Sequence, residues 1–229
     1  RQLRACFKRS WFLYAGLLAG VSALLILVSR GGTAGADPLD TETSRLAYLI
    51  TQGGVILHYL RLSLFPVGLS FDYIDWEVGI TTARLFQAAI VGILVILSGL
   101  GLWKRHPAGY AGAWFFLILA PTSSILPLKG AVFEHRMYLP LAGVVTLAVA
   151  GIYRAAAVYG RRLPESLRKR GGAARIIFAA AVIACLAGLT IMRNNDYRSD
   201  EAIWRDTLKK RPGNFRAHIN LAQALANSG

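Results

Sequence analysis

The 229-residue chain is strongly apolar, with 55% hydrophobic residues, only 17% charged residues and a mean hydropathy of +0.45. This composition excludes an ordinary soluble domain. The net charge of +14 suggests a nucleic-acid partner. However, the basic residues gather in short segments that flank apolar stretches, which is typical of membrane proteins. We therefore predict an integral membrane protein and expect no nucleic acid to bind it.

Five apolar stretches approach the length that crosses a bilayer, and none contains an acidic residue. They are 11–28, 83–103, 108–126, 137–157 and 176–192. A sixth stretch, 46–65, carries Gln52, His58 and Arg61 and is expected to be an interfacial or re-entrant helix. The predicted fold class is all-α, with a polytopic helical membrane bundle of about five spans and one interfacial or re-entrant helix over domain 1–192.

The charges between these stretches predict an orientation. Segments 1–9, 104–106 and 161–175 are rich in Lys and Arg, and Glu165 is their only acidic residue. The positive-inside rule places them in the cytoplasm. The acidic loop 66–82, the loop with Glu134 and the C-terminal tail then lie on the outer face. Because the chain is rich in Ala, Gly and Arg, we expect a bacterial inner membrane, with this face in the periplasm.

The residues after 192 change character and form a second predicted domain, 193–229. Apolar residues recur at helical spacing over 200–211 and 215–227, and Pro212, Gly213 and Asn214 separate the two segments. This pattern resembles the beginning of a tetratricopeptide-repeat domain, and a generic helical hairpin is the alternative. One incomplete repeat cannot bury its own apolar face. We therefore expect further repeats after Gly229, or packing of these helices against another element.

The loop before the fourth apolar stretch is the best candidate for a functional site. Ionisable side chains between two spans are costly unless they face a cavity or a partner. Four of them lie close together here: Lys129, Glu134, His135 and Arg136. The alternative is a polar connector whose charges lie in interfacial water.

Three motifs within 45–143 carry a family resemblance. They are Leu-Phe-Pro at 64–66 followed by Ser70-Phe71-Asp72-Tyr73, then Ala120-Pro121-Thr122-Ser123-Ser124, then Glu134-His135-Arg136-Met137-Tyr138-Leu139-Pro140. Together with the change to repeats, they resemble the transmembrane and tetratricopeptide-repeat proteins. This is a family of GT-C-type glycosyltransferases that includes protein O-mannosyltransferases. The third motif departs from the family pattern, because His135 separates Glu134 from Arg136.

The resemblance implies an enzyme that transfers a sugar from a polyprenyl-phosphate or polyprenyl-diphosphate donor to a protein or glycan on the outer face. Arg136 is expected to bind the donor phosphate, because its guanidinium gives bidentate hydrogen bonds that Lys129 cannot give. Glu134 would orient Arg136 or bind the sugar, and Tyr138 would close the site. His135 and Lys129 belong to the same expected substrate-binding set. The repeats would bind protein partners.

Asp72, with Asp75, is a second candidate for contact with the substrate or a divalent cation, and an ordinary interfacial loop is the alternative. No His or Cys spacing indicates a metal site, so no cofactor is assigned and a divalent cation stays open. The family's catalytic carboxylate follows the first span of the full protein. We expect this chain, which begins at Arg1, to be an internal fragment without that loop, and assign no catalytic base.

Two further functions remain open. A membrane-anchored tetratricopeptide-repeat scaffold would use the repeats without catalysis. An enzyme of the O-antigen ligase or polymerase type would share the lipid-linked glycan chemistry.

Overall fold

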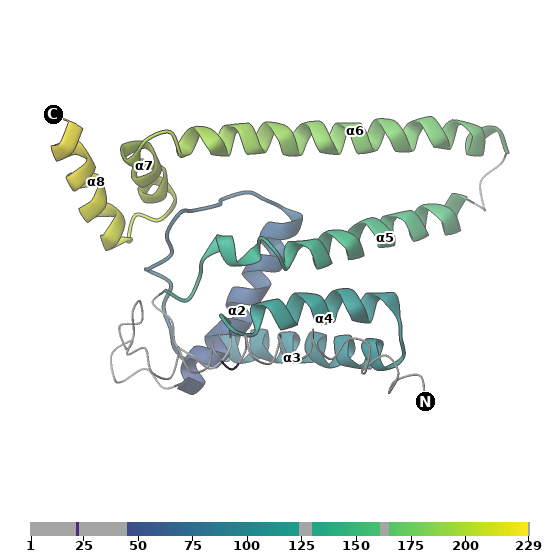
Figure 1. Cartoon of the computed structure of the whole chain (residues 1–229), viewed down its shortest axis with the longest axis horizontal. Helices are drawn as coiled ribbons and strands as arrows, with labels where there is room; N and C mark the ends of the chain where they lie inside the picture. Colours follow the sequence, from purple (N-terminus) through teal and green to yellow (C-terminus); the bar gives the residue numbers. More distant parts are fainter. Residues whose placement is uncertain (1–21, 23–44, 124–129, 161–164, 229) are drawn as a thin grey trace. The chain divides into compact units, whose positions relative to one another are not determined.

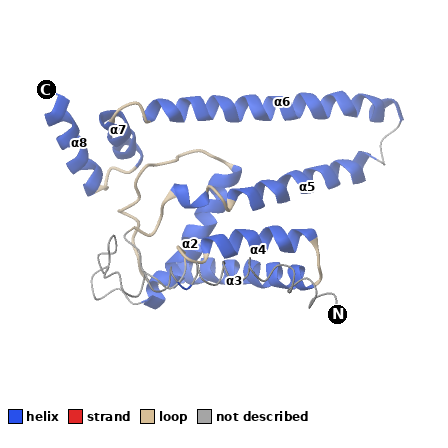
Figure 2. Ribbon diagram, viewed as in Figure 1, coloured by secondary structure: helices blue, strands red, loops and turns tan. Residues whose placement is uncertain are grey.

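The computed structural model of the chain describes Ser22 and residues 45–123, 130–160 and 165–228. Within these residues there are seven α-helices, one short 3-10 helix and no strand, so the all-α prediction holds for them (Figures 1 and 2). Apart from Ser22, the predicted span 11–28 lies outside the described residues, and so does Lys129. All contacts reported below belong to one compact unit, formed by 43–126 and 130–229.

Three helices are long and apolar enough to cross a membrane. They are α3 (Thr82–Trp103), α5 (Leu141–Gly160) and the Arg175–Asp196 part of α6 (Glu165–Asp196). At a rise of 1.5 Å per residue, α3 extends for about 33 Å, which matches a hydrocarbon core of about 30 Å. The three helices correspond to the predicted spans 83–103, 137–157 and 176–192, and support a membrane protein.

Helix α4 (Pro107–Leu119) is shorter than the predicted span 108–126. Its 13 residues extend for only about 20 Å. Pro121 follows the C-cap residue, Ala120, and has no N–H group to continue the hydrogen-bonding pattern. The N–H groups of Thr122 and Ser123 instead turn back to the carbonyl of Leu119, at 3.0 and 2.8 Å. Residues 124–126 of the predicted span lie outside the described residues.

Helix α2 (Arg45–Leu64) packs closely against α3. A Cβ atom on Gly53 would lie only 2.5 Å from Cα of Ala88, so glycine is required where these two backbones meet. Thr51 and Gln52, on the same stretch, are buried. The polar residues that distinguish 46–65 from the other apolar stretches are therefore covered by protein in part, which suits an element that is not surrounded by lipid.

The tail forms two helices at the predicted places, α7 (Asp200–Lys210) and α8 (Phe215–Ser228). The hydroxyl of Ser199 caps α7 by accepting a hydrogen bond from the Ala202 N–H at 3.1 Å. Asn214 caps α8 in the same way, through the Ala217 N–H at 2.9 Å. The interruption at 212–214 is confirmed as the turn between the helices, and the assignment of this hairpin to a tetratricopeptide repeat stays a prediction.

Candidate functional site

The candidate site lies where three segments meet: the loop 65–80 between α2 and α3, the 3-10 helix η1 (Glu134–Met137), and the tail from Arg193 onward. The loop has no regular secondary structure, yet Ser70, Asp72 and Tyr73 are all buried in it. Polar side chains that leave water in this way need hydrogen-bonding partners. Some of those partners lie within the loop, where the Ser70 hydroxyl donates to the Asp72 carbonyl at 3.2 Å. The others come from η1 and from the tail.

Glu134 supplies the contact between η1 and the loop. Its Oε1 atom accepts hydrogen bonds from the Ser70 N–H at 2.7 Å and from the Tyr73 hydroxyl at 2.5 Å. Burial raises the pKa of the Glu134 carboxyl above its ordinary value of 4.5. The two hydrogen bonds, and then the positive charges of Arg193 and Lys210, act against this rise. The result is a carboxyl group whose protonation depends on a few identified neighbours.

Tyr73 is the other half of this pair and is only 2% exposed. Burial raises the pKa of Tyr73, and the hydrogen bond to Glu134 adds to the rise, so the hydroxyl remains a neutral donor. The ring packs edge-on against His58 of α2, with centroids 5.5 Å apart, and lies 6.4 Å from Trp76. Rotation of the Tyr73 side chain is therefore blocked by the aromatic rings around it.

Helix α2 fixes η1 from a second direction. The Tyr59 hydroxyl donates to the carbonyl of Phe133 at 2.9 Å and accepts from its N–H at 2.8 Å. Tyr59 is fully buried, so these bonds are shielded from competing water. Since Phe133 directly precedes η1, the position of Glu134 is set by both α2 and the loop 65–80.

Arg136 does not pair with Glu134. Its Nη1 atom lies 3.3 Å from the Thr122 carbonyl and 3.4 Å from that of Ala131, and its Nη2 lies 3.5 Å from that of Gly130. The guanidinium also covers the Phe133 ring at 4.7 Å. These hydrogen bonds are long, so they are weak for a guanidinium. No contact between Glu134 and Arg136 therefore supports the expected role of Glu134 in orienting Arg136.

The remaining predicted site residues lie apart from the Glu134–Tyr73 pair. Tyr138 is 86% exposed. His135 is also exposed, with its ring 5.3 Å from that of Phe133. Within the predicted set, Arg136 and His135 both contact the Phe133 ring. Glu134 is connected to Asp72 through its hydrogen bonds to Tyr73 and Ser70.

Two of the three acidic residues of the loop, Asp72 and Asp75, face the tail, whereas Glu77 lies 3.8 Å from Arg84 of α3. Asp72 accepts from the Tyr73 N–H through Oδ1 at 2.9 Å, and its Oδ2 lies 3.6 Å from Nη1 of Arg216. The Asn214 side chain donates to the Asp72 carbonyl at 3.3 Å. Asp75 pairs with Arg211 at 2.6 Å. The charges that made Asp72 and Asp75 candidates for a substrate or a cation are thus paired with basic groups of the same chain.

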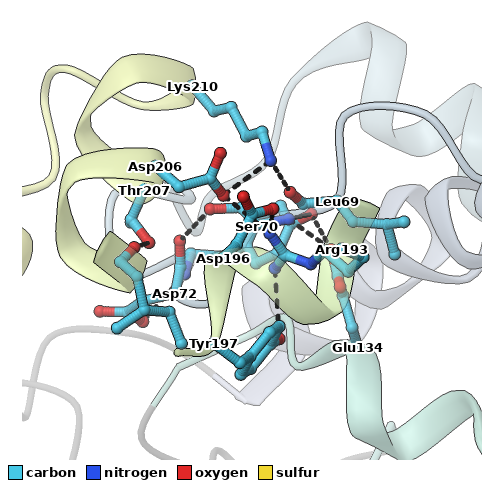
Figure 3. A network of polar contacts seen from close by, with 12 residues as sticks. Leu69, Ser70, Asp72, Glu134, Arg193, Asp196, Tyr197, Asp206, Thr207 and Lys210 are labelled. Atoms are coloured by element: carbon cyan, nitrogen blue, oxygen red, sulfur yellow. Dashed lines mark hydrogen bonds and ion pairs between the residues drawn. The ribbon is translucent and has the colours of Figure 1, made fainter. Parts of the chain in front are cut away.

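A further ionic network continues the junction into α6 and α7 (Figure 3). Arg193 pairs with Asp206 at 2.7 Å and with Asp196 at 3.1 Å. Lys210 pairs with Asp206 at 2.7 Å and donates to the Leu69 carbonyl at 2.8 Å. The sequence analysis did not identify Arg193, Arg211 or Lys210. The one available signal was charge complementarity between an acidic loop without Lys or Arg and a basic stretch in the tail.

The described residues offer no ready metal site. Nowhere among them do three His, Cys, Asp or Glu side chains come together so as to hold an ion. The acidic groups of the junction have Arg, Lys, Tyr or backbone N–H partners instead. The possible divalent cation of the sequence analysis stays a prediction, and no chemical step is derived through one.

An apolar groove of about 810 Å³ lies along α2, α3 and α4. Its lining is almost entirely aliphatic and aromatic, with Gly53, Val91, Gly92 and Phe116 among the residues that form it. Gln52 and Ser123 also line it, and their buried polar atoms have no hydrogen-bonding partner in the described part of the chain. A volume of this size is typical of sites that take small organic ligands or lipid chains.

Comparisons with known proteins now add to this geometry. The chain is similar to mouse protein O-mannosyl-transferase TMTC4, with 28% identity over 97% of the chain and 31% of that protein. It is also similar to human protein O-mannosyl-transferase TMTC1, with 25% identity over 79% of the chain and 21% of the relative. The Caenorhabditis elegans protein O-mannosyl-transferase F38B6.6 is 22% identical to the chain over 93% of the chain and 30% of its own length.

The predicted family resemblance is confirmed. It extends over the apolar helices and into the tail, since the mouse TMTC4 match covers nearly the whole chain. The chain spans less than a third of the length of these curated relatives. No protein-family profile matches the sequence. No solved structure matches it either.

The Glu134 carboxyl yields a stability prediction. In Glu134→Gln the amide oxygen can still accept from Ser70 and Tyr73, whereas Glu134→Ala leaves both donors without their acceptor. Loss of a buried partner costs about 1–3 kcal/mol, so we expect Glu134→Ala to lower the thermal unfolding midpoint in detergent clearly more than Glu134→Gln. Equal midpoints for the two variants would contradict the role of these hydrogen bonds.

The pH dependence of the same midpoint has a definite sign. The folded chain holds the Glu134 proton more tightly than the unfolded chain, because the pKa of the folded state is raised above 4.5. The contribution of Glu134 to the free energy of unfolding is therefore fully present below pH 4.5. It decreases as the pH rises through the pKa of the folded state. We expect this decrease to be smaller in Glu134→Gln than in the wild type when midpoints are measured at a series of pH values.

Proposed function

We propose that this chain is part of a membrane glycosyltransferase that transfers a sugar from a polyprenyl-phosphate donor to protein on the outer side of a bacterial inner membrane. The observation that carries this proposal is the similarity to mouse protein O-mannosyl-transferase TMTC4 over 97% of the chain. That match includes both the apolar helices and the tail. Protein O-mannosylation is accordingly the form of transfer that we favour.

The apolar groove along α2, α3 and α4 supports a lipid-linked donor. A polyprenyl chain offers only hydrocarbon to its binding site, and the groove presents mainly hydrocarbon in return. Its 810 Å³ can hold several isoprene units. In this proposal the groove binds the polyprenyl chain, and the phosphate lies near the end of α4, where Arg136 contacts the Thr122 carbonyl.

Arg136 is the proposed phosphate ligand, with Lys129 and His135 as further positive or hydrogen-bonding groups. The guanidinium contacts three carbonyls at 3.3–3.5 Å, and these long bonds can be exchanged for charge-assisted bonds to phosphate. Exposed Tyr138 would then cover the sugar.

Glu134 would bind a sugar hydroxyl through its Oε2 atom, since both of its hydrogen bonds to the described residues end on Oε1. The base that activates the acceptor is not assigned to any residue of this chain.

The tail would present the acceptor, as a set of helical repeats does for a protein partner. Its α8 helix leaves Phe215 and Ile219 about 60% exposed on one side. These side chains fit a proposed contact with a following repeat or with a protein partner.

The phosphate role of Arg136 is tested by comparison with Lys129. In the full-length protein, Arg136→Lys keeps the charge and removes bidentate bonding, which is worth about 1.5 kcal/mol or more for a charged group. We therefore expect sugar transfer to decrease about tenfold or more, with a higher KM for the polyprenyl-phosphate sugar. Lys129→Ala should have a smaller effect. Wild-type transfer by correctly inserted Arg136→Lys would make Arg136 a structural residue.

The donor groove is tested by a matched pair of glycine substitutions. A Cβ atom on Gly92 of α3 or on Gly151 of α5 meets no other atom within 4 Å, so a side chain can leave the backbone without a clash at both helix positions. Only Gly92 lines the groove. We expect Gly92→Leu to raise the KM for the polyprenyl-linked donor several-fold and Gly151→Leu to leave it unchanged. The groove proposal is wrong if both variants have wild-type donor kinetics.

The orientation is tested by thiol labelling of a variant without Cys6 and Cys185. Val67 and Lys104 are exposed, and α3, which is about 33 Å long, lies between them in the chain. Val67→Cys should react with a membrane-impermeant reagent in intact cells with a permeabilised outer membrane, and Lys104→Cys only after the inner membrane is opened. The opposite result would place the loop 65–80 in the cytoplasm.

A further inference from the structure

The turn between α7 and α8 binds the loop 65–80 through Arg211. The Nε atom of Arg211 donates to Oδ1 of Asp75 at 2.6 Å. Its guanidinium carbon lies 4.5 Å from the centroid of the Tyr73 ring and 5.8 Å from that of Trp76. One side chain of the tail is thus held by a carboxylate and two aromatic rings of the loop, and it covers the face of Tyr73.

Tyr73 makes a second contact at its other end. Its hydroxyl donates to Glu134 at 2.5 Å, while its ring contacts Arg211. Because the aromatic ring is rigid, a displacement of the ring moves the hydroxyl with it. Tyr73 therefore forms a direct physical connection between the tail and the carboxyl group of η1.

We propose that Arg211 and Tyr73 are positioning residues: Arg211 of the tail fixes the Tyr73 ring, and the Tyr73 hydroxyl fixes the Glu134 carboxylate for the sugar. The consequence for sugar transfer rests on the proposed function. The coupling of the tail to Glu134 rests only on the contacts described above and does not depend on that function. It makes the state of the outer site depend on whether the repeat hairpin is docked.

Other contacts keep the tail in place, so Arg211 has a role separate from docking alone. Lys210 donates to the Leu69 carbonyl, Asn214 to the Asp72 carbonyl, and Trp204 packs edge-on against Phe71 with centroids 5.2 Å apart. A change at Arg211 removes one of several contacts. Its effect on Tyr73 can therefore be measured in a chain whose tail remains docked.

Several charged and titratable groups face Glu134. They are Tyr73 of the loop, Tyr59 of α2, Arg193 of α6 and Lys210 of α7. Of these, Tyr73 donates a hydrogen bond to the carboxylate, which favours the ionised form. Loss or misplacement of that hydroxyl must therefore raise the pH at which Glu134 titrates.

The test follows the carboxyl band of Glu134 by infrared difference spectroscopy on the full-length protein in membranes, with Glu134→Gln identifying the band. Tyr73→Phe keeps the ring for Arg211 and removes the hydroxyl, so the titration should move up by about one pH unit. Arg211→Lys keeps the charge beside Asp75 and loses the planar stacking, so the titration should move in the same direction by a smaller amount. The double variant should match Tyr73→Phe alone.

The matched control is Arg216→Gln. Arg216 also belongs to the tail and pairs with Asp72, yet it is not stacked on Tyr73. This variant removes a full positive charge from the junction, so it measures the effect of charge without loss of stacking. It should move the titration less than Arg211→Lys does. Resistance to protease cleavage near Pro212 verifies that the tail stays docked in each variant.

The outcomes separate this inference from the proposed function. A wild-type titration in Arg211→Lys, or additive shifts in the double variant, would overturn the coupling of the tail to Glu134. If the shifts occur and the wild type transfers no sugar, the coupling stands and the glycosyltransferase proposal fails. If sugar is transferred, the acid limb of its pH profile must move with the Glu134 titration, and an unchanged limb would overturn the role of the coupling in transfer.

Discussion

The partial burial of one carboxyl group, that of Glu134, imposes the central constraint on this molecule. A carboxylate taken out of water is costly unless strong donors replace its hydration. Here the donors are the Tyr73 hydroxyl and the Ser70 N–H, both from a loop more than 60 positions away in the sequence. The requirement for these donors holds the irregular loop 65–80 against η1, although the loop has no strand or helix of its own.

The tail then uses the surface that this loop presents. Asp72 and Asp75 lie on either side of Tyr73 in sequence and receive Arg216 and Arg211. An acidic loop that bound no basic partner would repel itself and remain hydrated. With these partners it becomes a receptor for the first helical hairpin of the tail. The same few side chains thus hold the candidate site and place the hairpin beside it.

The sequence predicted the elements with strong local signals and missed those set by distant contacts. Hydropathy located α3, α5 and the apolar part of α6, and Pro212 marked the turn between α7 and α8. The charge of Glu134, Arg136 and Asp72, their place between apolar stretches and the family motifs drew attention to these three residues. The roles of Tyr73 and Arg211 were not predicted, because their contact joins residues 138 positions apart, and no periodicity encodes it. The predicted span 108–126 extends beyond the end of α4 at Leu119, although Pro121 gave a signal for that end.

These contacts also constrain how the chain passes through a membrane. Glu134 touches the loop 65–80, and Arg211 touches the same loop, so η1, the loop and the α7–α8 turn must share one membrane face. If α3 crosses away from that face, the chain must return between 104 and 133, and α5 and α6 then make the next two crossings. Helix α4 covers about 20 Å of that return, so the residues after Leu119 must complete it. The close approach of α4 to α3, where Gly109 lies against Gly101, suits a return that is covered by protein on one side. The predicted common location of the acidic loop, the Glu134 loop and the tail is thereby supported by packing as well as by charge.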